Sequence, residues 1–267
     1  MPFRDRVAIV AGASGGIGSA TVRAFLAKGM RVVLAAPQDP LLETIAQEMA
    51  PFGDRALIVP TDITRREDVD RLAATALVTY GRIDVLANVA GIGSSPSLAE
   101  TTDTELEQVL AVNLLGAARL IQAVLPVMKA QRSGSIVNIG SVAGEAAVMG
   151  IYSASKFGLR GLNDTIRREV KSYNIGVTLI QPGFVRTSMN AAMGDKLPGP
   201  EVVADAIVAA IEKPRRKHIV PGNYRLPVFL INAFPGFTDL VFGNARIQQR
   251  LNRDARAARA ATRTEAT

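Results

Sequence analysis

The chain has 267 residues, 48% hydrophobic content and a mean hydropathy of +0.19, enough apolar residues for the core of one α/β domain. It has no cysteine and one histidine, His218, which excludes disulfides, thiolate nucleophiles and multi-histidine metal sites. The net charge of +7 comes from residues 212–267, which hold 11 Lys/Arg and 4 Asp/Glu, whereas residues 1–211 are balanced. A neutral body without tryptophan argues against nucleic-acid binding.

The N-terminal segment reaches a Val-Ala-Ile-Val run within a few residues and lacks the apolar region of a signal peptide, so we expect a cytoplasmic location. Apolar runs then alternate with helix-period segments as far as residue 221, which is typical of βαβ units. Strands are expected at residues 7–11, 31–35, 56–60, 85–89, 135–139, 177–181 and 218–221. Helices are expected near residues 16–28, 40–50, 65–80, 103–130, 151–173 and 201–212. The predicted fold class is α/β, a single doubly wound Rossmann-type parallel sheet of about seven strands with helices on both faces.

A glycine-rich loop, Gly12-Ala13-Ser14-Gly15-Gly16-Ile17-Gly18, connects the first predicted strand to the first predicted helix. Glycines let the backbone turn tightly and approach a pyrophosphate, whose charge is stabilised by the amides at the helix start. Such a loop can also serve only to pack helix on strand. Its position between the first strand and the first helix favours a dinucleotide site.

Tyr152 and Lys156 lie four residues apart in a predicted helix. Positions i and i+4 share one helix face and are about 6 Å apart, so the ammonium group would favour ionisation of the phenol. Most pairs with this spacing are surface neighbours without chemistry. The functional interpretation therefore depends on the motifs around the pair.

The glycine-rich loop and the Tyr152–Lys156 pair are accompanied by two further motifs. These are Asn88-Val89-Ala90-Gly91 after the fourth strand and Gln181-Pro182-Gly183-Phe184-Val185-Arg186-Thr187 after the sixth. In this combination the chain resembles the short-chain dehydrogenase/reductase family from about residue 5 to residue 221. The resemblance implies an oxidoreductase that transfers a hydride between NAD(P)(H) and a carbonyl or secondary alcohol, without a metal. It also divides the chain into a catalytic domain with both cofactor and substrate sites, residues 1–225, and an apolar then Arg-rich tail, residues 226–267.

The resemblance assigns catalysis to Asn113, Ser141, Tyr152 and Lys156. Tyr152 would donate a proton during reduction and accept one during oxidation, while Ser141 would hold the substrate oxygen. Lys156 would bind the ribose hydroxyls and lower the Tyr152 pKa. Asn113 would bend its helix and hold a water in the proton path.

The resemblance also assigns a set of cofactor contacts, in which the Val185 backbone and the Thr187 hydroxyl would bind the nicotinamide carboxamide. The full set is Gly12, Ser14, Gly15, Gly16, Ile17, Gly18, Ala36, Asp62, Ile63, Asn88, Ala90, Gly91, Tyr152, Lys156, Pro182, Gly183, Val185 and Thr187. Asp62 would bind the adenine amino group, and the residues equally allow it to be the N-cap of the helix that begins at Arg65.

Three positions depart from the family pattern. Ala11 stands where a threonine is usual, and Val89 replaces the second asparagine of an Asn-Asn-Ala-Gly segment. Ser141 and Tyr152 are 11 positions apart, whereas many relatives have 13. The shortened loop lines the substrate pocket, so we expect an altered pocket shape.

The residues after the second strand favour NADP(H) over NAD(H). Ala36 stands where NAD-preferring relatives carry an acid that binds the ribose 2′-hydroxyl. Against this, Pro37 and Gly15 occupy positions where NADP-preferring relatives place basic residues. Asp39 is either a surrogate acid or the start of the next helix.

Methionines between Thr187 and Glu201 favour an apolar substrate, although the segment also reads as an ordinary loop. Residues 226–242 are apolar but contain two prolines, so a membrane-spanning helix is not expected. Arginines then recur every three or four residues, at Arg246, Arg250, Arg253, Arg256, Arg259 and Arg263. One interpretation is a peripheral contact with an anionic membrane surface. The other is a helix over the pocket or a subunit contact, followed by a solvated end.

The family resemblance further implies a homodimer or homotetramer, formed through the helices that carry Asn113 and Tyr152. A second functional hypothesis is a non-catalytic dinucleotide-binding redox sensor or interaction protein. Such a sensor needs the glycine loop but not the phenol. The presence of Asn113, Ser141, Tyr152 and Lys156 therefore favours the enzyme.

Overall fold

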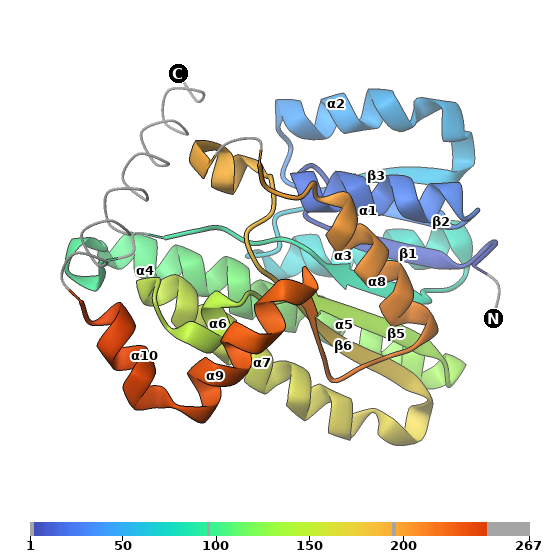
Figure 1. The fold of residues 1–267 in the computed structure, drawn as a ribbon. Coiled ribbons are helices and arrows are strands. Elements are labelled where there is room, and N and C mark those ends of the chain that lie inside the picture. Colours follow the sequence, from blue (N-terminus) through green and yellow to red (C-terminus); the bar gives the residue numbers. More distant parts are fainter. Residues whose placement is uncertain (1–2, 95–96, 194–195, 245–267) are drawn as a thin grey trace.

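The computed structural model describes residues 3–94, 97–193 and 196–244. In these residues one parallel seven-stranded sheet has the order β3-β2-β1-β4-β5-β6-β7 (Figure 1). Strands β2 and β3 extend the sheet in one direction from β1, and β4 to β7 extend it in the other. The strands are β1 (Val7–Ala11), β2 (Arg31–Ala36), β3 (Ala56–Pro60), β4 (Val85–Asn88), β5 (Gly134–Ile139), β6 (Ile175–Pro182) and β7 (Lys217–Val220). The predicted doubly wound sheet is confirmed, with strand bounds that differ from prediction by at most two residues.

Helices cover both faces of the sheet. They are α1 (Gly16–Ala27), α2 (Pro40–Met49), α3 (Arg66–Tyr80), α4 (Asp103–Leu110), α5 (Ala117–Gln131), α6 (Ala143–Ala146), α7 (Gly150–Glu169), α8 (Glu201–Glu212), α9 (Arg225–Ala233) and α10 (Pro235–Phe242). A π-helical segment, η3 (Ala111–Gly116), joins α4 to α5. Short 3-10 turns are η1 (Ala50–Arg55), η2 (Leu98–Glu100), η4 (Lys171–Tyr173), η5 (Ser188–Met193) and η6 (Gly222–Tyr224).

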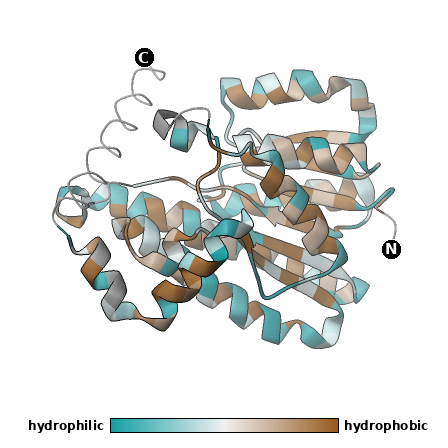
Figure 2. Ribbon diagram, viewed as in Figure 1, coloured by the Kyte–Doolittle hydropathy of each residue, from teal (hydrophilic) through white to brown (hydrophobic). Residues whose placement is uncertain are grey.

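Two apolar cores hold the layers together. Side chains of α1, α2 and α8 pack on one face of the sheet, and those of α3, α5 and α7 on the other. The strands carry apolar residues on both faces, because both are covered by helices, and appear mostly brown in Figure 2. The sheet thus places the carboxyl ends of its strands, where the predicted site residues lie, along one edge.

The helix carrying Asn113 was predicted as one continuous α-helix, and the structure instead interrupts it with η3. The combined span Asp103–Gln131 is long and apolar enough to cross a membrane by length and composition alone. In the described fold it packs against α3, α7 and the central strands β4 and β5. It is therefore a layer of the α/β fold.

The C-terminal apolar segment forms two short helices, α9 and α10, separated by Phe234. Pro227 and Pro235 lie in their first turns, where the missing proline amide costs no helical hydrogen bond. Helix α9 packs against α6, so the C-terminal helices lie beside the segment that follows β5 (Figure 1). The predicted arginine run begins at Arg246 and lies outside the described residues.

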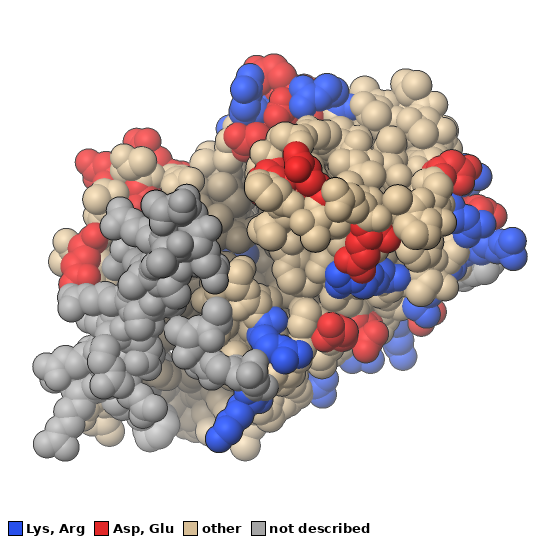
Figure 3. Space-filling view, turned by 90° about the horizontal axis from the view of Figure 1, so that it is seen from above, with Lys and Arg blue, Asp and Glu red and all other residues tan. Residues whose placement is uncertain are grey.

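Positive and negative side chains are mixed on one face of the molecule. On the face in Figure 3, Lys and Arg side chains are interspersed with Asp and Glu and form no continuous basic stripe among the residues drawn in colour. This agrees with the balanced charge of residues 1–211.

Candidate active site

The glycine loop turns sharply between β1 and α1. Gly12 has a φ of 84°, and a Cβ there would lie 2.6 Å from the backbone nitrogen of Ala90. A Cβ on Gly18 would collide with the carbonyl oxygen of Gly12. Helix α1 begins at the glycine loop, and no side chain caps its first backbone amides. The loop is therefore a cradle that side chains would fill, as expected of a pyrophosphate site.

Loops from distant parts of the chain meet at this cradle. A Cβ on Gly16 would lie 3.3 Å from the methyl carbon of Thr187, so the loop after β6 closes against the glycine loop. The other predicted cofactor residues lie at the same edge of the sheet, at the carboxyl ends of its strands or in the segments that follow them. They are Ser14, Gly15 and Ile17 beside α1, Ala36 at the end of β2, Ile63 after β3, Asn88, Ala90 and Gly91 at β4, and Pro182, Gly183 and Val185 at β6.

Two acidic residues with open interpretations have defined hydrogen bonds. Asp62 Oδ1 accepts from the Thr64 amide at 2.8 Å and the Thr64 hydroxyl at 2.7 Å, which closes a turn before α3. Since α3 begins at Arg66 with no side-chain cap, the N-cap interpretation of Asp62 is wrong. Asp39 Oδ1 accepts from the Leu42 amide at 2.8 Å and caps α2. This agrees with the interpretation that Asp39 starts the next helix.

Tyr152 and Lys156 lie on buried turns of α7. The Lys156 ammonium lies 5.7 Å from the centroid of the Tyr152 ring and donates to the carbonyl of Ile139 at 3.0 Å. The Ser141 side chain, two residues after β5, interacts with the Tyr152 hydroxyl and favours its ionised form. The structure thus brings the predicted hydroxyl, phenol and ammonium groups together despite the short loop between Ser141 and Tyr152.

Burial sets the pKa values of this pair. It lowers the pKa of Lys156 to about 8. It raises the pKa of Tyr152 above its usual value, and the interaction with the Ser141 side chain opposes that rise. The direction for Tyr152 is opposite to the one expected from the nearby ammonium group, because desolvation of the phenolate outweighs other influences.

Asn113 occupies the π-helical segment η3 and is buried. Its amide donates to the Ile92 carbonyl at 2.9 Å, and its Oδ1 accepts from the Ile92 amide at 2.8 Å. A Cβ on Gly91 would lie 3.2 Å from Lys156 Nζ and 3.3 Å from Asn113 Oδ1. Asn113 and Lys156 therefore approach each other across Gly91, where a methyl group would be tightly packed against both side chains.

Sequence reasoning missed three polar residues beside the site. Ser155 accepts from the Asn113 amide at 3.0 Å and donates to the Tyr152 carbonyl at 2.7 Å, which links the two helices. Ser94 accepts from the Tyr152 amide at 3.2 Å. Glu145 is a buried carboxylate in α6. Its signal was visible as the only charge in the apolar run between Ser141 and Tyr152.

Comparison with known proteins identifies the family. A family model for short chain dehydrogenases matches residues 6–198. The chain belongs to the short-chain dehydrogenase family. Two relatives of this family member are uncharacterized oxidoreductases of Staphylococcus. The one from Staphylococcus aureus (strain N315) is 33% identical over 220 residues, 80% of this chain and 94% of the relative. The one from Staphylococcus haemolyticus (strain JCSC1435) is 34% identical over 222 residues, 81% of this chain and 95% of the relative.

Solved structures agree with this assignment. A short-chain dehydrogenase/reductase from Burkholderia phymatum in complex with NAD has a TM-score of 0.81 and 26% identity, over 89% of this chain and 96% of that one. An actinorhodin polyketide ketoreductase variant with NADPH has a TM-score of 0.76 and 28% identity, over 82% of this chain and 97% of that one. This short-chain dehydrogenase is thus an NAD(P)-dependent oxidoreductase acting on CH–OH groups, as predicted.

Proposed function

We propose that the protein interconverts an apolar carbonyl compound and its secondary alcohol, with Tyr152 as the acid/base and NADP(H) as the preferred cofactor. The observation that carries the proposal is the burial of Ser141, Tyr152 and Lys156 in one site, with the Lys156 ammonium 5.7 Å from the centroid of the phenol ring. A bound nicotinamide supplies or accepts the hydride. The chain's own groups have only to orient the substrate and move a proton.

Each polar group has one task in this scheme. Ser141 binds the substrate oxygen, and its Oγ is oriented by the Ala143 amide, which donates to it at 3.0 Å. Tyr152 gives its proton to that oxygen during reduction and takes it back during oxidation. Lys156 binds the ribose hydroxyls and stabilises the phenolate. Asn113, held by its bonds to Ile92, keeps a proton path open to solvent beside Gly91.

Replacement of the phenol tests the acid/base role. Tyr152→Phe removes only the hydroxyl, so we expect turnover to fall by at least about a hundredfold while NADPH binding persists. A Tyr152→Phe variant with near-normal turnover would refute the assigned acid/base. The alternative of a redox sensor predicts nucleotide binding without turnover of any aliphatic, steroid-like or aromatic carbonyl in the unmodified protein.

The preference for NADP(H) rests on the end of β2. Ala36 supplies no carboxylate to bind a ribose 2′-hydroxyl or to repel a 2′-phosphate, and Asp39 already uses one oxygen to cap α2. The ratio of kcat/KM for NADPH and NADH, measured with one carbonyl substrate, tests the preference. A ratio in favour of NADH would overturn it.

An apolar substrate fits the side chains around the loop after β6. Met189, in η5, is partly exposed, and its thioether would lie 3.8 Å from a Cβ on Gly93. Thioethers adapt to irregular apolar shapes. A carbonyl panel graded by chain length and ring number, with each KM measured, should show KM falling as apolar surface increases.

Peripheral contact of this cytoplasmic enzyme with an anionic membrane would bring such substrates to it. In Figure 2, α9 and α10 carry hydrophobic segments, and Leu226, Phe229, Phe234 and Leu240 are each more than half exposed. The arginine-rich sequence that follows supplies positive charge. Flotation with phosphatidylserine liposomes, comparing the full chain with one that ends at Asn244, tests the contact. Failure of both proteins to float with the liposomes would refute the membrane contact.

A homo-oligomer is the proposed assembly. Leu115 on η3 and Phe157 on α7 are large apolar side chains left exposed on two elements that pack against each other. A second copy of the chain would cover such a surface.

A further inference from the structure

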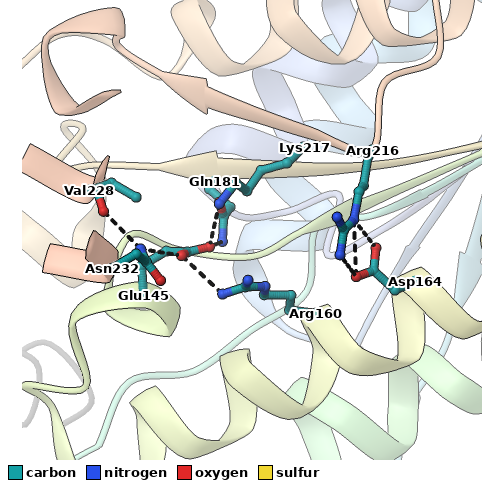
Figure 4. A network of polar contacts seen from close by, with 8 residues as sticks. All are labelled: Glu145, Arg160, Asp164, Gln181, Arg216, Lys217, Val228 and Asn232. Carbon is teal, nitrogen blue, oxygen red and sulfur yellow. Dashed lines mark hydrogen bonds and ion pairs between the residues drawn. The ribbon is translucent and has the colours of Figure 1, made fainter. Parts of the chain in front are cut away.

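Glu145 lies four residues after Ser141, in α6, and its side chain is completely buried. Four side chains of the described residues donate to its two oxygens, as Figure 4 shows. Gln181 of β6 and Lys217 of β7 bind Oε1 at 2.8 Å and 3.0 Å. Arg160 of α7 and Asn232 of α9 bind Oε2 at 3.0 Å and 2.8 Å. One carboxylate therefore joins α6 to two helices and two strands.

The arrangement stabilises the ionised carboxylate. Burial alone would raise the pKa of Glu145, but the hydrogen bonds from Gln181, Lys217 and Asn232 outweigh burial, and the pKa lies below its ordinary value. The two cations, Arg160 and Lys217, remain about one-third exposed. Glu145 thus stays charged at neutral pH, and its removal would leave these donors facing one another without an acceptor.

The same short helix touches the reacting groups. The Ala143 amide donates to Ser141 Oγ at 3.0 Å. A Cβ on Gly144 would lie 3.0 Å from the Cβ of Lys156, so α6 rests directly on the turn of α7 that carries the lysine. A displacement of α6 would therefore move the Ser141 hydroxyl and the support of Lys156 together.

Helix α9 enters this network through Asn232. The Asn232 amide donates both to Glu145 and to the Val228 carbonyl at 2.8 Å, within its own helix. The second bond orients the amide toward α6. The position of α9 is thus transmitted to α6 by a contact between residues 87 positions apart.

We propose that Glu145 is a positioning residue that holds α6, and with it the Ser141 hydroxyl, in the reactive geometry and couples this geometry to α9 through Asn232. The inference rests on the proposed Tyr152 chemistry. The short loop between Ser141 and Tyr152 explains the need for it, since few residues of the loop are left to brace the hydroxyl. A displacement of about 1 Å at a reacting group can cost about a hundredfold in rate.

Glu145→Gln tests the proposal, because it keeps the side-chain shape and removes the charge. We expect kcat, normalised to the measured number of NADPH-binding sites, to fall by about tenfold or more, with the NADPH Kd within about twofold of the unmodified protein. Asn232→Ala, which removes one donor, should reduce normalised kcat by about threefold or more. Normalisation separates positioning from loss of folded protein, because a purely structural role would lower the number of binding sites and leave normalised kcat unchanged.

A neighbouring ion pair provides the matched control. Asp164, also on α7, binds Arg216, the residue before Lys217, and neither residue is among the hydrogen-bond partners of Glu145 drawn in Figure 4. Asp164→Asn should leave normalised kcat within about twofold. Unchanged normalised kcat in both Glu145→Gln and Asn232→Ala would overturn the inference, as would an equal loss in Asp164→Asn. If Glu145→Gln does not fold, Asn232→Ala and Lys217→Met give the same decision.

Tyr152→Phe, assayed in parallel, separates this inference from the proposed function. Near-normal turnover in Tyr152→Phe would refute the acid/base assignment whatever the Glu145 variants do. Collapse in Tyr152→Phe with unchanged normalised kcat in both Glu145→Gln and Asn232→Ala would refute only the positioning role.

Discussion

Gly12 and Gly18 fix the path of the glycine loop by the absence of side chains. Their Cβ positions are occupied by the Ala90 backbone and by the Gly12 carbonyl. Gly15, in the same loop, is exposed, and a Cβ there would lie 3.6 Å from the carbonyl oxygen of Gly12, an ordinary contact. Gly12 and Gly18 are therefore required by close backbone contacts, whereas Gly15 is not, although all three belong to the same sequence motif.

Gly18→Ala and Gly15→Ala make a matched pair. We expect Gly18→Ala to destabilise the fold by about 1–3 kcal/mol and to weaken NADPH binding, since the loop must shift to admit the methyl group. Gly15→Ala should change the free energy of unfolding by less than about 0.5 kcal/mol. Denaturant unfolding and NADPH titration measure both. Equal effects of the two substitutions would contradict the assigned geometry.

The buried ammonium of Lys156 makes stability depend on pH. Its pKa of about 8 in the folded protein lies below the ordinary 10.5, so between these values the unfolded chain binds a proton that the folded protein does not. Stability should therefore rise with pH across this window, and the cost of the buried charge should be largest below pH 8, at up to about 3 kcal/mol.

Lys156→Met should remove this dependence. We expect the difference in unfolding free energy between the variant and the unmodified protein to be largest near pH 7.5 and to shrink toward pH 10. His218 does not interfere, because burial moves its pKa below 6.5. A difference that stays constant from pH 7.5 to 10 would show that the ammonium is not held in the buried site.

The π-helical segment η3 explains how an asparagine can lie inside a long helix. A π turn rotates the following residues relative to a regular helix, and Asn113 uses this turn to reach the backbone of Ile92 and the hydroxyl of Ser155. The segment thereby joins the loop after β4 to α7. The Asn113 side chain supplies hydrogen bonds that the backbone of this loop would otherwise lack.

Asn113→Ala should break this junction. The Ile92 amide and carbonyl lose their partners, so we expect a loss of about 1–3 kcal/mol in the free energy of unfolding and a lower kcat at saturating NADPH. Gln122→Ala, which removes an exposed amide from α5, is the control and should do neither. A variant with normal kcat would remove Asn113 from the proton path.

The assembly can be tested through the exposed apolar residues on η3 and α7. Leu115 and Phe157 are 48% and 40% exposed, respectively. If a second copy covers them, Phe157→Arg should lower the molar mass measured by light scattering to that of the 28.3 kDa monomer. Val78→Arg, at an 87% exposed position on α3, should leave the mass unchanged. A monomeric unmodified protein would refute the proposed oligomer.

Most of the sheet and its helices could be predicted from sequence because each element carries its own pattern. The apolar runs of β1 and β3 are bounded by turn residues, and the predicted bounds agree with the structure. The Tyr152–Lys156 pair was visible because its spacing is local. Helix α6 was missed because it spans four residues and depends on partners in α7, β6, β7 and α9. The direction of the Tyr152 pKa was missed because burial is a property of the packed protein.

The contact between Glu145 and Asn232 also limits how the protein can be recombined. A chimera that takes α9 and α10 from another member of the family would bring a foreign residue to position 232, and the carboxylate of α6 would lose a donor. The two positions should therefore change together during descent, and an exchange of the C-terminal helices should preserve turnover only when the residue at position 145 is exchanged with them.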